Sequence, residues 1–303
     1  MGRYWAAIVA ASITCTSWAQ IPGSDIWLIA LQDNTDSKHA ALKVADTWVK
    51  VTDAPFYHNQ PYFTADDSLV YYTGSDASGQ TDFYRYDIAS GNTVNVTQST
   101  TSEYSPTPVP NQEALSGIWV DDNGKQWLRQ WSLSTDDTRQ LLPIDPIGYH
   151  VWLNNTDVLV FVLGTSEEQP HTLQRWSTLG DAQTGDIVDN NIGASLWAIP
   201  NQADKFSYSK LENEQHWLMQ YDAKTKQTQK LTKLPESSAY YAWTPDGKAV
   251  TVSPDSEGLI YWQYGSDSDW QPFISITSQC KYGASRLVFS NNTEQLALVC
   301  NRG

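Results

Sequence analysis

Short apolar runs alternate with polar turns along the chain, and one four-residue segment recurs among them. It consists of an aromatic or apolar residue, a variable residue, usually Pro or Asn, and then Asp or Asn. The copies are Phe63–Asp66, Pro108–Asn111, Trp152–Asn155, Ala198–Asn201, Trp243–Asp246 and Phe289–Asn292. Their first residues lie 45, 44, 46, 45 and 46 positions apart, and this near-constant spacing indicates a structural repeat.

Each repeat has the pattern of four short strands. A first strand leads into the turn segment, where Asp or Asn bonds the nearby backbone and tolerates the left-handed conformation of a tight hairpin. Alternating apolar runs predict second strands at Leu69–Tyr72, Leu115–Val120, Val158–Leu163, Phe206–Tyr208, Ala249–Val252 and Leu296–Val299. Third strands are marked by Tyr84 and Tyr86, Trp127 and Trp131, Trp176, Trp217 and Tyr221, and Tyr261 and Tyr264. Fourth strands are expected at Val94–Thr97, Arg139–Leu142, Ile187–Val188, Gln229–Thr232 and Pro272–Ile276.

Four strands in about 45 residues, repeated six times, predict an all-β protein with the fold of a six-bladed β-propeller and four-stranded blades. The sixth repeat stops after its second strand, and its missing strands are expected at Asp25–Leu31 and Trp48–Thr52. The last blade would then combine two N-terminal with two C-terminal strands, which closes the ring and removes strand edges. We expect residues 20–303 to form this single domain, with a polar insert at Gln32–Asp46 that has room for a short helix.

The N-terminus has the pattern of a secretory signal peptide over residues 1–19. Arg3 supplies the positive start, Tyr4–Thr14 is apolar, and small residues at Ser17 and Ala19 predict cleavage before Gln20. A membrane anchor, which needs about 20 apolar residues, and lipidation at Cys15 are the alternatives. After cleavage we expect no membrane insertion.

The mature chain would keep two cysteines, Cys280 and Cys300. One cysteine pair in an exported protein predicts one disulfide, and antiparallel pairing around the turn at Asn291-Asn292 would place the two residues nearly opposite each other. Two buried free thiols are the alternative.

Composition and charge narrow the range of partners. Hydrophobic residues make up 40% of the chain, which is enough for a folded core. The formal net charge of −15 opposes binding to nucleic acids and to anionic membranes.

The segment Trp243-Thr244-Pro245-Asp246-Gly247-Lys248 resembles the repeat signature of TolB-like propellers, also called PD40 or WD40-like. Weaker copies stand at Phe63–Asp67 and Pro108–Gln112. Five further segments resemble a single-domain, exported subgroup of these propellers. They are His58–Pro61, Ser102–Pro106, Gly148–His150, Phe161–Gly164 and Asn191–Gly193. The resemblance implies a propeller in the bacterial periplasm or a secreted one, and it implies no activity. We expect no Tol–Pal role, because no separate TolB-type N-terminal domain is evident. His58 stands where the subgroup pattern has Asp, so a site that uses this carboxylate would be changed.

In a propeller of this kind, we expect ligands at the channel mouth, where the loops before the innermost strands converge. These loops are expected at residues 53–60, 101–105, 145–150, 190–195, 236–241 and 278–286. They would bring together as ligand-binding residues His58, Asn59, Glu103, Tyr104, Tyr149, His150, Asn191, Tyr240 and Arg286. Alternatively, these side chains only cap strands and satisfy loop backbone.

Catalysis at this mouth would depend on His150 and Glu103, which could form an acid–base pair. His58, His150 and Glu103 could also hold a metal, but they are scattered in the sequence, so we predict no metal. No phosphate or dinucleotide motif points to a cofactor. We therefore predict a monomeric binding module for an envelope protein, peptide or glycan. The alternative is an envelope hydrolase or lyase that acts on a carbohydrate or lactone through the same mouth.

Overall fold

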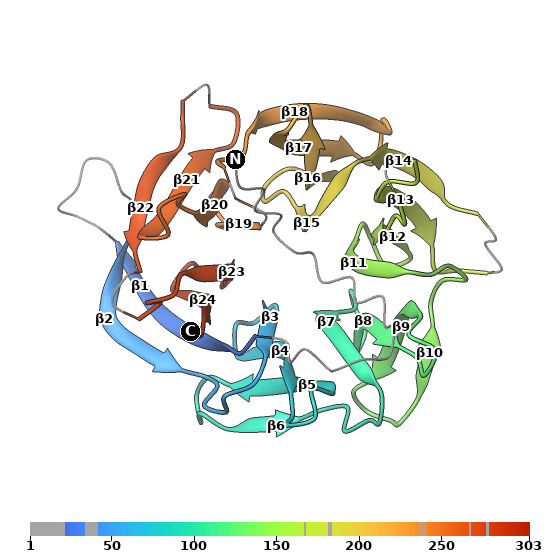
Figure 1. The fold of residues 1–303 in the computed structure, drawn as a ribbon, viewed down its shortest axis with the longest axis horizontal. Helices are drawn as coiled ribbons and strands as arrows, with labels where there is room; N and C mark the ends of the chain where they lie inside the picture. Colours follow the sequence, from blue (N-terminus) through green and yellow to red (C-terminus); the bar gives the residue numbers. More distant parts are fainter. Residues whose placement is uncertain are drawn as a thin grey trace.

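Six four-stranded antiparallel sheets surround a central axis in the computed structural model (Figure 1). It describes residues 22–33, 42–166, 168–180, 184–236, 238, 240–266, 268–276 and 279–303, and only the backbone of residues 33 and 42–46. Every repeat forms one blade, with its first strand nearest the axis. The predicted all-β fold, a six-bladed propeller, is confirmed.

The blades are numbered in chain order, and their strands are given from the axis outward. Blade 1 contains β3 (His58–Phe63), β4 (Leu69–Ser75), β5 (Thr81–Asp87) and β6 (Thr93–Asn95). Blade 2 contains β7 (Ser102–Pro108), β8 (Ala114–Val120), β9 (Gln126–Ser132) and β10 (Thr138–Gln140). Blade 3 contains β11 (Ile147–Trp152), β12 (Asp157–Val162), β13 (Thr172–Ser177) and β14 (Asp186–Asn190).

Blade 4 contains β15 (Ile192–Ala198), β16 (Lys205–Glu212), β17 (Gln215–Asp222) and β18 (Gln227–Lys233). Blade 5 contains β19 (Tyr241–Trp243), β20 (Lys248–Val252), β21 (Gly258–Gln263) and β22 (Gln271–Ser275). Blade 6 contains β23 (Ala284–Phe289), β24 (Gln295–Asn301), β1 (Ser24–Asp33) and β2 (Leu42–Lys50).

Blade 6 joins the two ends of the chain, as predicted. Strand β1 lies between β24 and β2, with Trp27 opposite Leu298 on one side and Lys50 on the other. The Arg302 guanidinium adds a two-point ion pair with the Asp25 carboxylate, at 3.0 and 2.6 Å. The insert after β1 differs from expectation because β2 already begins at Leu42, so residues 42–46 are strand and not helix. Residues 34–41 and the predicted signal peptide lie outside the described residues.

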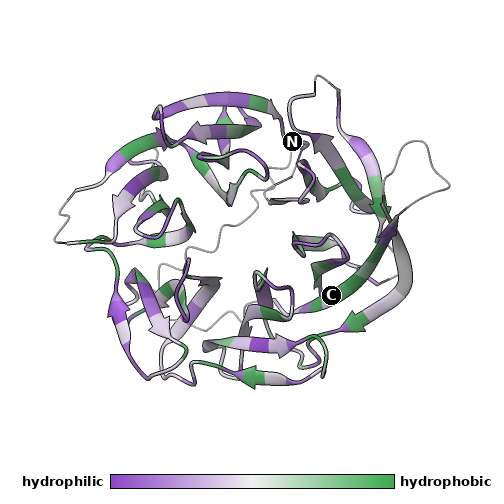
Figure 2. Ribbon diagram, turned by 180° about the vertical axis from the view of Figure 1, so that it is seen from behind, coloured by the Kyte–Doolittle hydropathy of each residue, from purple (hydrophilic) through white to green (hydrophobic). Residues whose placement is uncertain are grey.

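Burial falls from the second strand to the outermost strand of a blade. Strand β12 is almost wholly buried, whereas β10 and most of β18 are exposed. Figure 2 shows hydrophilic segments along the outer rim of the ring. The core therefore consists of apolar layers between neighbouring blades. Within the described residues, no helix is long and apolar enough to cross a membrane.

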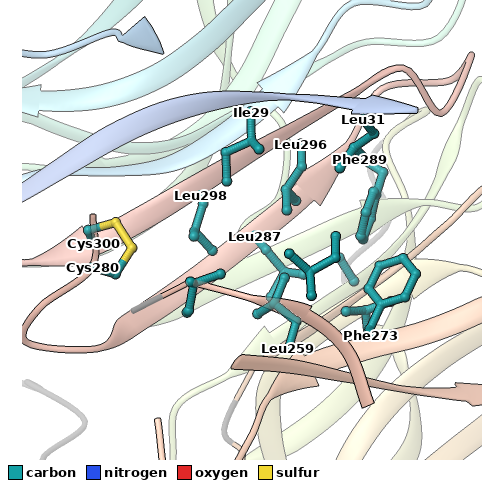
Figure 3. Close-up of a cluster of buried hydrophobic side chains, with 14 residues drawn as sticks. Ile29, Leu31, Leu259, Phe273, Cys280, Leu287, Phe289, Leu296, Leu298 and Cys300 are labelled. Carbon is teal, nitrogen blue, oxygen red and sulfur yellow. A yellow bond between two sulfur atoms is a disulfide. The ribbon is translucent and has the colours of Figure 1, made fainter. Parts of the chain in front are cut away.

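One of these layers lies between blades 5 and 6 and contains the predicted disulfide (Figure 3). Cys280 and Cys300 are bonded, with their Cα atoms 4.9 Å apart. The two cysteines lie close together as predicted, but they are not a pair in the strand ladder, where Cys300 is opposite Ala284. Cys280 instead comes from the loop before β23, where a turn closed by the Gly283 N–H and the Cys280 carbonyl brings it back toward Cys300.

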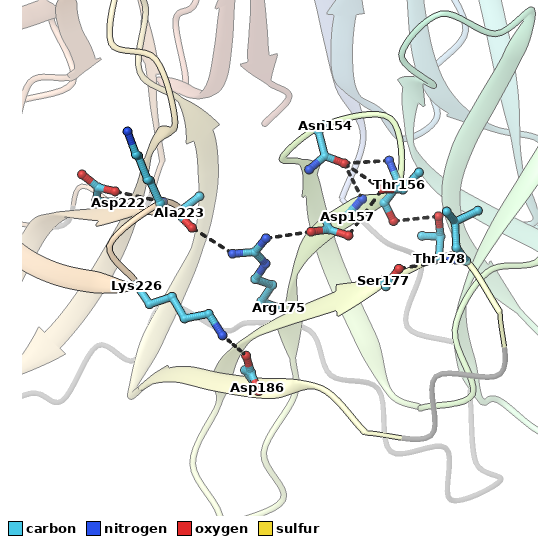
Figure 4. A network of polar contacts seen from close by, with 12 residues as sticks. Asn154, Thr156, Asp157, Arg175, Ser177, Thr178, Asp186, Asp222, Ala223 and Lys226 are labelled. Atoms are coloured by element: carbon cyan, nitrogen blue, oxygen red, sulfur yellow. Dashed lines mark hydrogen bonds and ion pairs between the residues drawn. The ribbon is translucent and has the colours of Figure 1, made fainter.

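Polar contacts also join neighbouring blades. Arg175 is held within blade 3 by the Asp157 carboxylate at 2.7 Å, and it donates across to the Ala223 carbonyl of blade 4 at 2.9 Å (Figure 4). Lys226 and Asp186 form a second link at 2.9 Å.

The repeated turns form a further set of contacts at one end of the ring. Their asparagines bridge blades in pairs: Asn111 to Asn155, Asn201 to the Pro245 carbonyl, and Asn291 to Asp67. The turns therefore link blade 2 to 3, blade 4 to 5, and blade 6 to 1.

Candidate functional site

A cavity of about 580 Å³ follows the axis and is lined by the innermost strands of all six blades. In Figure 1 these strands surround the centre of the ring. One end is the mouth, formed where the loops lead into the innermost strands, and the other end lies at the repeated hairpin turns. Aromatic, aliphatic and proline side chains make up most of the lining.

Irregular pairing near the mouth sets the direction of the lining side chains. The register shifts between Asn59 and Tyr62 in blade 1 and between Tyr104 and Thr107 in blade 2. Blades 3, 4 and 6 have corresponding shifts in their innermost strands. A bulge redirects the side chains that follow it. Tyr149 and Arg286 come directly after such shifts, and both line the cavity.

Arg286 is held at the mouth by tyrosines from other blades. Its Cζ atom lies 3.8 Å from the ring centroid of Tyr240 and 4.8 Å from that of Tyr149. Its Nη2 donates a hydrogen bond of 2.5 Å to the Tyr149 hydroxyl. Blades 6 and 3 lie on opposite sides of the ring, so the contact between Arg286 and Tyr149 crosses the axis.

Three tyrosines around Arg286, namely Tyr149, Tyr240 and Tyr57, form a cage in which the guanidinium stays charged. Burial alone would lower the pKa of Arg286, but the hydroxyls of Tyr149, Tyr240 and Tyr57 outweigh this effect and raise it. Burial raises the pKa of Tyr149 to about 12, against the opposing charge of Arg286. Both groups therefore keep their ordinary protonation at neutral pH, a cation beside a neutral phenol.

Below the mouth, a second contact spans the channel. The rings of Tyr62 and Trp197 are stacked, with centroids 6.3 Å apart and an interplanar angle of 17°. They come from blades 1 and 4, which also lie on opposite sides of the ring. The Trp197 indole N–H is fixed by a 2.7 Å bond to the Tyr241 carbonyl. The channel is thus crossed at two levels, by the contact of Arg286 with Tyr149 and by the stacking of Tyr62 on Trp197.

His150 lies in the cavity wall as a neutral side chain. Its Nε2 is 2.7 Å from the Ser116 hydroxyl, which also accepts from the Trp152 indole at 2.9 Å and donates to the Thr107 carbonyl. Burial lowers the pKa of His150 to about 3. This ring is therefore uncharged at neutral pH in this arrangement.

Glu103 lies at the junction of blades 1 and 2, and it does not line the cavity. The residue is only 1% exposed. Its carboxylate accepts hydrogen bonds from Ser99 Oγ at 2.5 Å and from Thr97 Oγ1 at 3.1 Å. Burial raises the pKa of Glu103 to about 7, the charge of Asp82 adds to this rise, and the hydroxyl bonds oppose it. Glu103 and His150 each bond to other groups, so the expected acid–base pair is not formed.

The other predicted site residues lie outside the cavity lining. His58 is buried, with Nδ1 3.1 Å from the Ser24 carbonyl, and burial lowers its pKa. Asn59 accepts from the Gln60 N–H, and Tyr104 packs on the core between blades 2 and 3. Asn191 is an exposed residue with a left-handed backbone, at φ 56°. Of the nine predicted residues, Tyr149, His150, Tyr240 and Arg286 line the cavity.

Sequence reasoning missed Tyr62 and Trp197, although the repeat contains a signal for them. The residue just before each repeated segment lines the cavity in five blades, as Tyr62, Thr107, Val151, Trp197 and Val288. Aligning the repeats one position further toward the N-terminus would have identified this position.

In the part of the chain that the structure describes, no group of three or more His, Cys, Asp or Glu side chains is arranged to hold a metal ion.

No protein-family profile matches the sequence, and no curated protein matches it. TolB from Acinetobacter baumannii has a similar structure, with a TM-score of 0.58 and 12% identity, over 91% of this chain and 64% of TolB. This chain thus spans less than two thirds of that protein. A protein described as TolB from Agrobacterium tumefaciens gives a TM-score of 0.63 with 9% identity, over 93% and 99% of the two chains. An oligogalacturonate lyase in complex with manganese gives 0.57 with 14% identity, over 86% and 82%. The fold is that of a TolB-like β-propeller.

Proposed function

We propose that this TolB-like propeller is a binding module whose axial cavity receives a short segment of an exported partner. The cavity itself carries the proposal. Its volume of about 580 Å³ falls within the range typical of ligand sites, and apolar walls surround a few polar groups that converge at the mouth. The disulfide and the N-terminal signal pattern support a location outside the cytoplasm, in the periplasm or secreted.

The chemistry of the lining favours a peptide over a glycan. The lining tryptophans, Trp152, Trp197 and Trp243, all donate their indole N–H groups to wall residues. These three N–H groups are therefore not available to the hydroxyls of a sugar, and hydrogen bonds to water that a site does not replace are costly. Each innermost strand lies at the end of its sheet, which leaves a backbone edge that an extended peptide can pair with.

The alternative hydrolase or lyase has less support. Propellers of similar fold include a lyase, but that similarity concerns the fold alone. In this chain the proposed acid–base residues are separate: His150 is bonded to Ser116, and Glu103 is bonded to hydroxyls at a blade junction.

Filling the cavity tests the proposal. We expect the wild-type protein to enrich sequences from a mixed library of six-residue peptides, as measured by mass spectrometry, and not from a set of neutral and acidic oligosaccharides. Val151→Trp, on the partly buried part of the wall, should reduce this enrichment at least tenfold because the larger side chain occupies the cavity. Ala89→Trp is the matched control on an exposed turn.

Melting temperatures of the variants show whether they are folded, and Ala194→Trp on another blade provides a second filled cavity. Undiminished peptide enrichment by both folded cavity variants would contradict binding in the cavity. Enrichment of oligosaccharides alone would replace the peptide with a glycan.

A further inference from the structure

The cavity has an unusual charge for this protein. The whole chain contains 34 acidic and 19 basic residues, yet Arg286 is the only charged side chain among the described residues that line the cavity. The acidic side chains are thus kept away from the axis, where one cation remains.

Arg286 has no carboxylate partner within the described residues. Other arginines do: Arg175 pairs with Asp157, and Arg302 pairs with Asp25. A cation that is removed from water normally requires an opposite charge, because its desolvation is unfavourable. The ring of Tyr240 and the hydroxyl of Tyr149 partly replace the missing partner, but the Tyr149 hydroxyl, whose pKa is raised by burial, brings no negative charge at neutral pH.

The cage also presents the guanidinium in a form suited to an incoming anion. Tyr240 covers one face of the group, which leaves recognition to the N–H groups at its edge. Among these, Nη2 already donates to the Tyr149 hydroxyl, so an oxygen acceptor is accommodated at that position. A guanidinium edge matches the two oxygens of a carboxylate, and such paired bonds are stronger than bonds to a neutral hydroxyl.

We propose that the peptide segment bound in the cavity presents a carboxylate to Arg286. This carboxylate takes the place of the Tyr149 hydroxyl as the acceptor of the Arg286 hydrogen bond. This inference rests on the proposed function and names the chemical class of its ligand. The carboxylate is the C-terminus of the peptide or the side chain of Asp or Glu. Its apolar neighbours in the peptide would lie against the aromatic and proline residues deeper in the cavity.

Three six-residue libraries distinguish the sources of the carboxylate. The first has neutral side chains and a free C-terminus, the second has the same sequences with an amidated C-terminus, and the third is amidated with one Asp or Glu. We expect the wild-type protein to enrich the first or the third at least tenfold over the second. The library that is enriched identifies the source.

Variants connect this preference to Arg286. Arg286→Met should abolish it, and Arg286→Lys should retain part of it, because the charge remains without the planar edge. Tyr149→Phe should retain or increase it, since a competing acceptor is removed. Lys281→Met is the control, because it removes an exposed cation outside the cavity lining.

The outcomes separate this inference from the proposed function. Equal enrichment of all three libraries, or an unchanged carboxylate preference in folded Arg286→Met and Arg286→Lys, would overturn the carboxylate contact. If Val151→Trp still abolished peptide binding in that case, the cavity would remain the binding site. If Arg286→Met does not fold, Arg286→Lys together with the wild-type library preference decides the question.

Discussion

At the scale of single residues, two buried carboxylates show how this acidic chain tolerates charge in its interior. Asp82 and Glu103 lie within one group of hydroxyl and amide donors, and Thr97 Oγ1 lies 3.1 Å from both carboxylates. No lysine or arginine forms an ion pair with either one in the described ranges. Burial and the charge of Asp82 destabilise the ionised form of Glu103, and hydrogen bonds from the hydroxyls stabilise it. The first two effects are larger, so the pKa of Glu103 rises to about 7.

This raised pKa predicts a dependence of stability on pH. Between the ordinary value of 4.5 and about 7, the folded state holds a proton on Glu103 that the unfolded state has lost. The contribution of Glu103 is therefore complete below pH 4.5 and is lost as the pH rises to 7, by about 3 kcal/mol at most. His150 acts in the opposite direction: its lowered pKa removes stability as the pH falls from 6.5 to about 3.

Comparison with Glu103→Gln isolates the first effect, because the histidines are common to both proteins. Urea unfolding at pH 5 and pH 8 should show wild-type stability falling relative to Glu103→Gln by roughly 1–3 kcal/mol. Exposed Glu113→Gln should follow the wild type. A constant difference between wild type and Glu103→Gln at both pH values would contradict the raised pKa.

The turn residues show a limit of sequence reasoning at the same scale. The sequence pattern indicates that Asp or Asn at the fourth position tolerates the left-handed conformation of the turn, and Asn111 and Asn201 adopt it, at φ 56° and 59°. In blades 1, 5 and 6 the following residue takes this conformation instead: Asp67, Gly247 and Thr293. The sequence pattern identified the turns correctly, because Asp and Asn favour several related turn geometries that differ by one residue.

At the scale of elements, the strands lie close to where the sequence pattern predicts them. The residues that line the cavity are less evident from that pattern. Alternation and spacing predicted four strands per blade, because one face of each strand must be buried against a neighbouring blade. The candidate site was placed in the loops before the innermost strands, but most lining residues belong to the strands themselves. The bulges that redirect Tyr149 and Arg286 depend on pairing between strands, which apolar periodicity does not report.

The disulfide stabilises the element that closes the ring. Cys280 and Cys300 are separated by 20 residues and belong to the apolar layer between blades 5 and 6. Replacing both with serine should lower the free energy of unfolding by about 3 kcal/mol, because the unfolded chain regains the freedom of an open loop. Urea unfolding of Cys280→Ser/Cys300→Ser measures this, with reduced wild-type protein as the control. Equal stability of the oxidised wild type and the double variant would contradict it.

At the scale of the whole molecule, the closed ring separates two kinds of surface. Exposed outermost strands such as β10 and β18 lie on the rim, and an aromatic cavity lined by the cation of Arg286 follows the axis. The repeat length and the incomplete sixth repeat were sufficient to predict this ring and the blade shared by the two termini. Contacts across the axis, such as Arg286 with Tyr149 and Tyr62 with Trp197, join blades that are distant in the sequence. They became evident only when the ring had been assembled.

The most direct test of the central claim is a crystal structure of the protein with a peptide enriched from the libraries. We predict that the peptide lies in the axial cavity, with a carboxylate within hydrogen-bonding distance of the Arg286 guanidinium and with Tyr149 displaced from it. A peptide bound to the outer strands, with Arg286 still bonded to Tyr149 across the axis, would contradict the account.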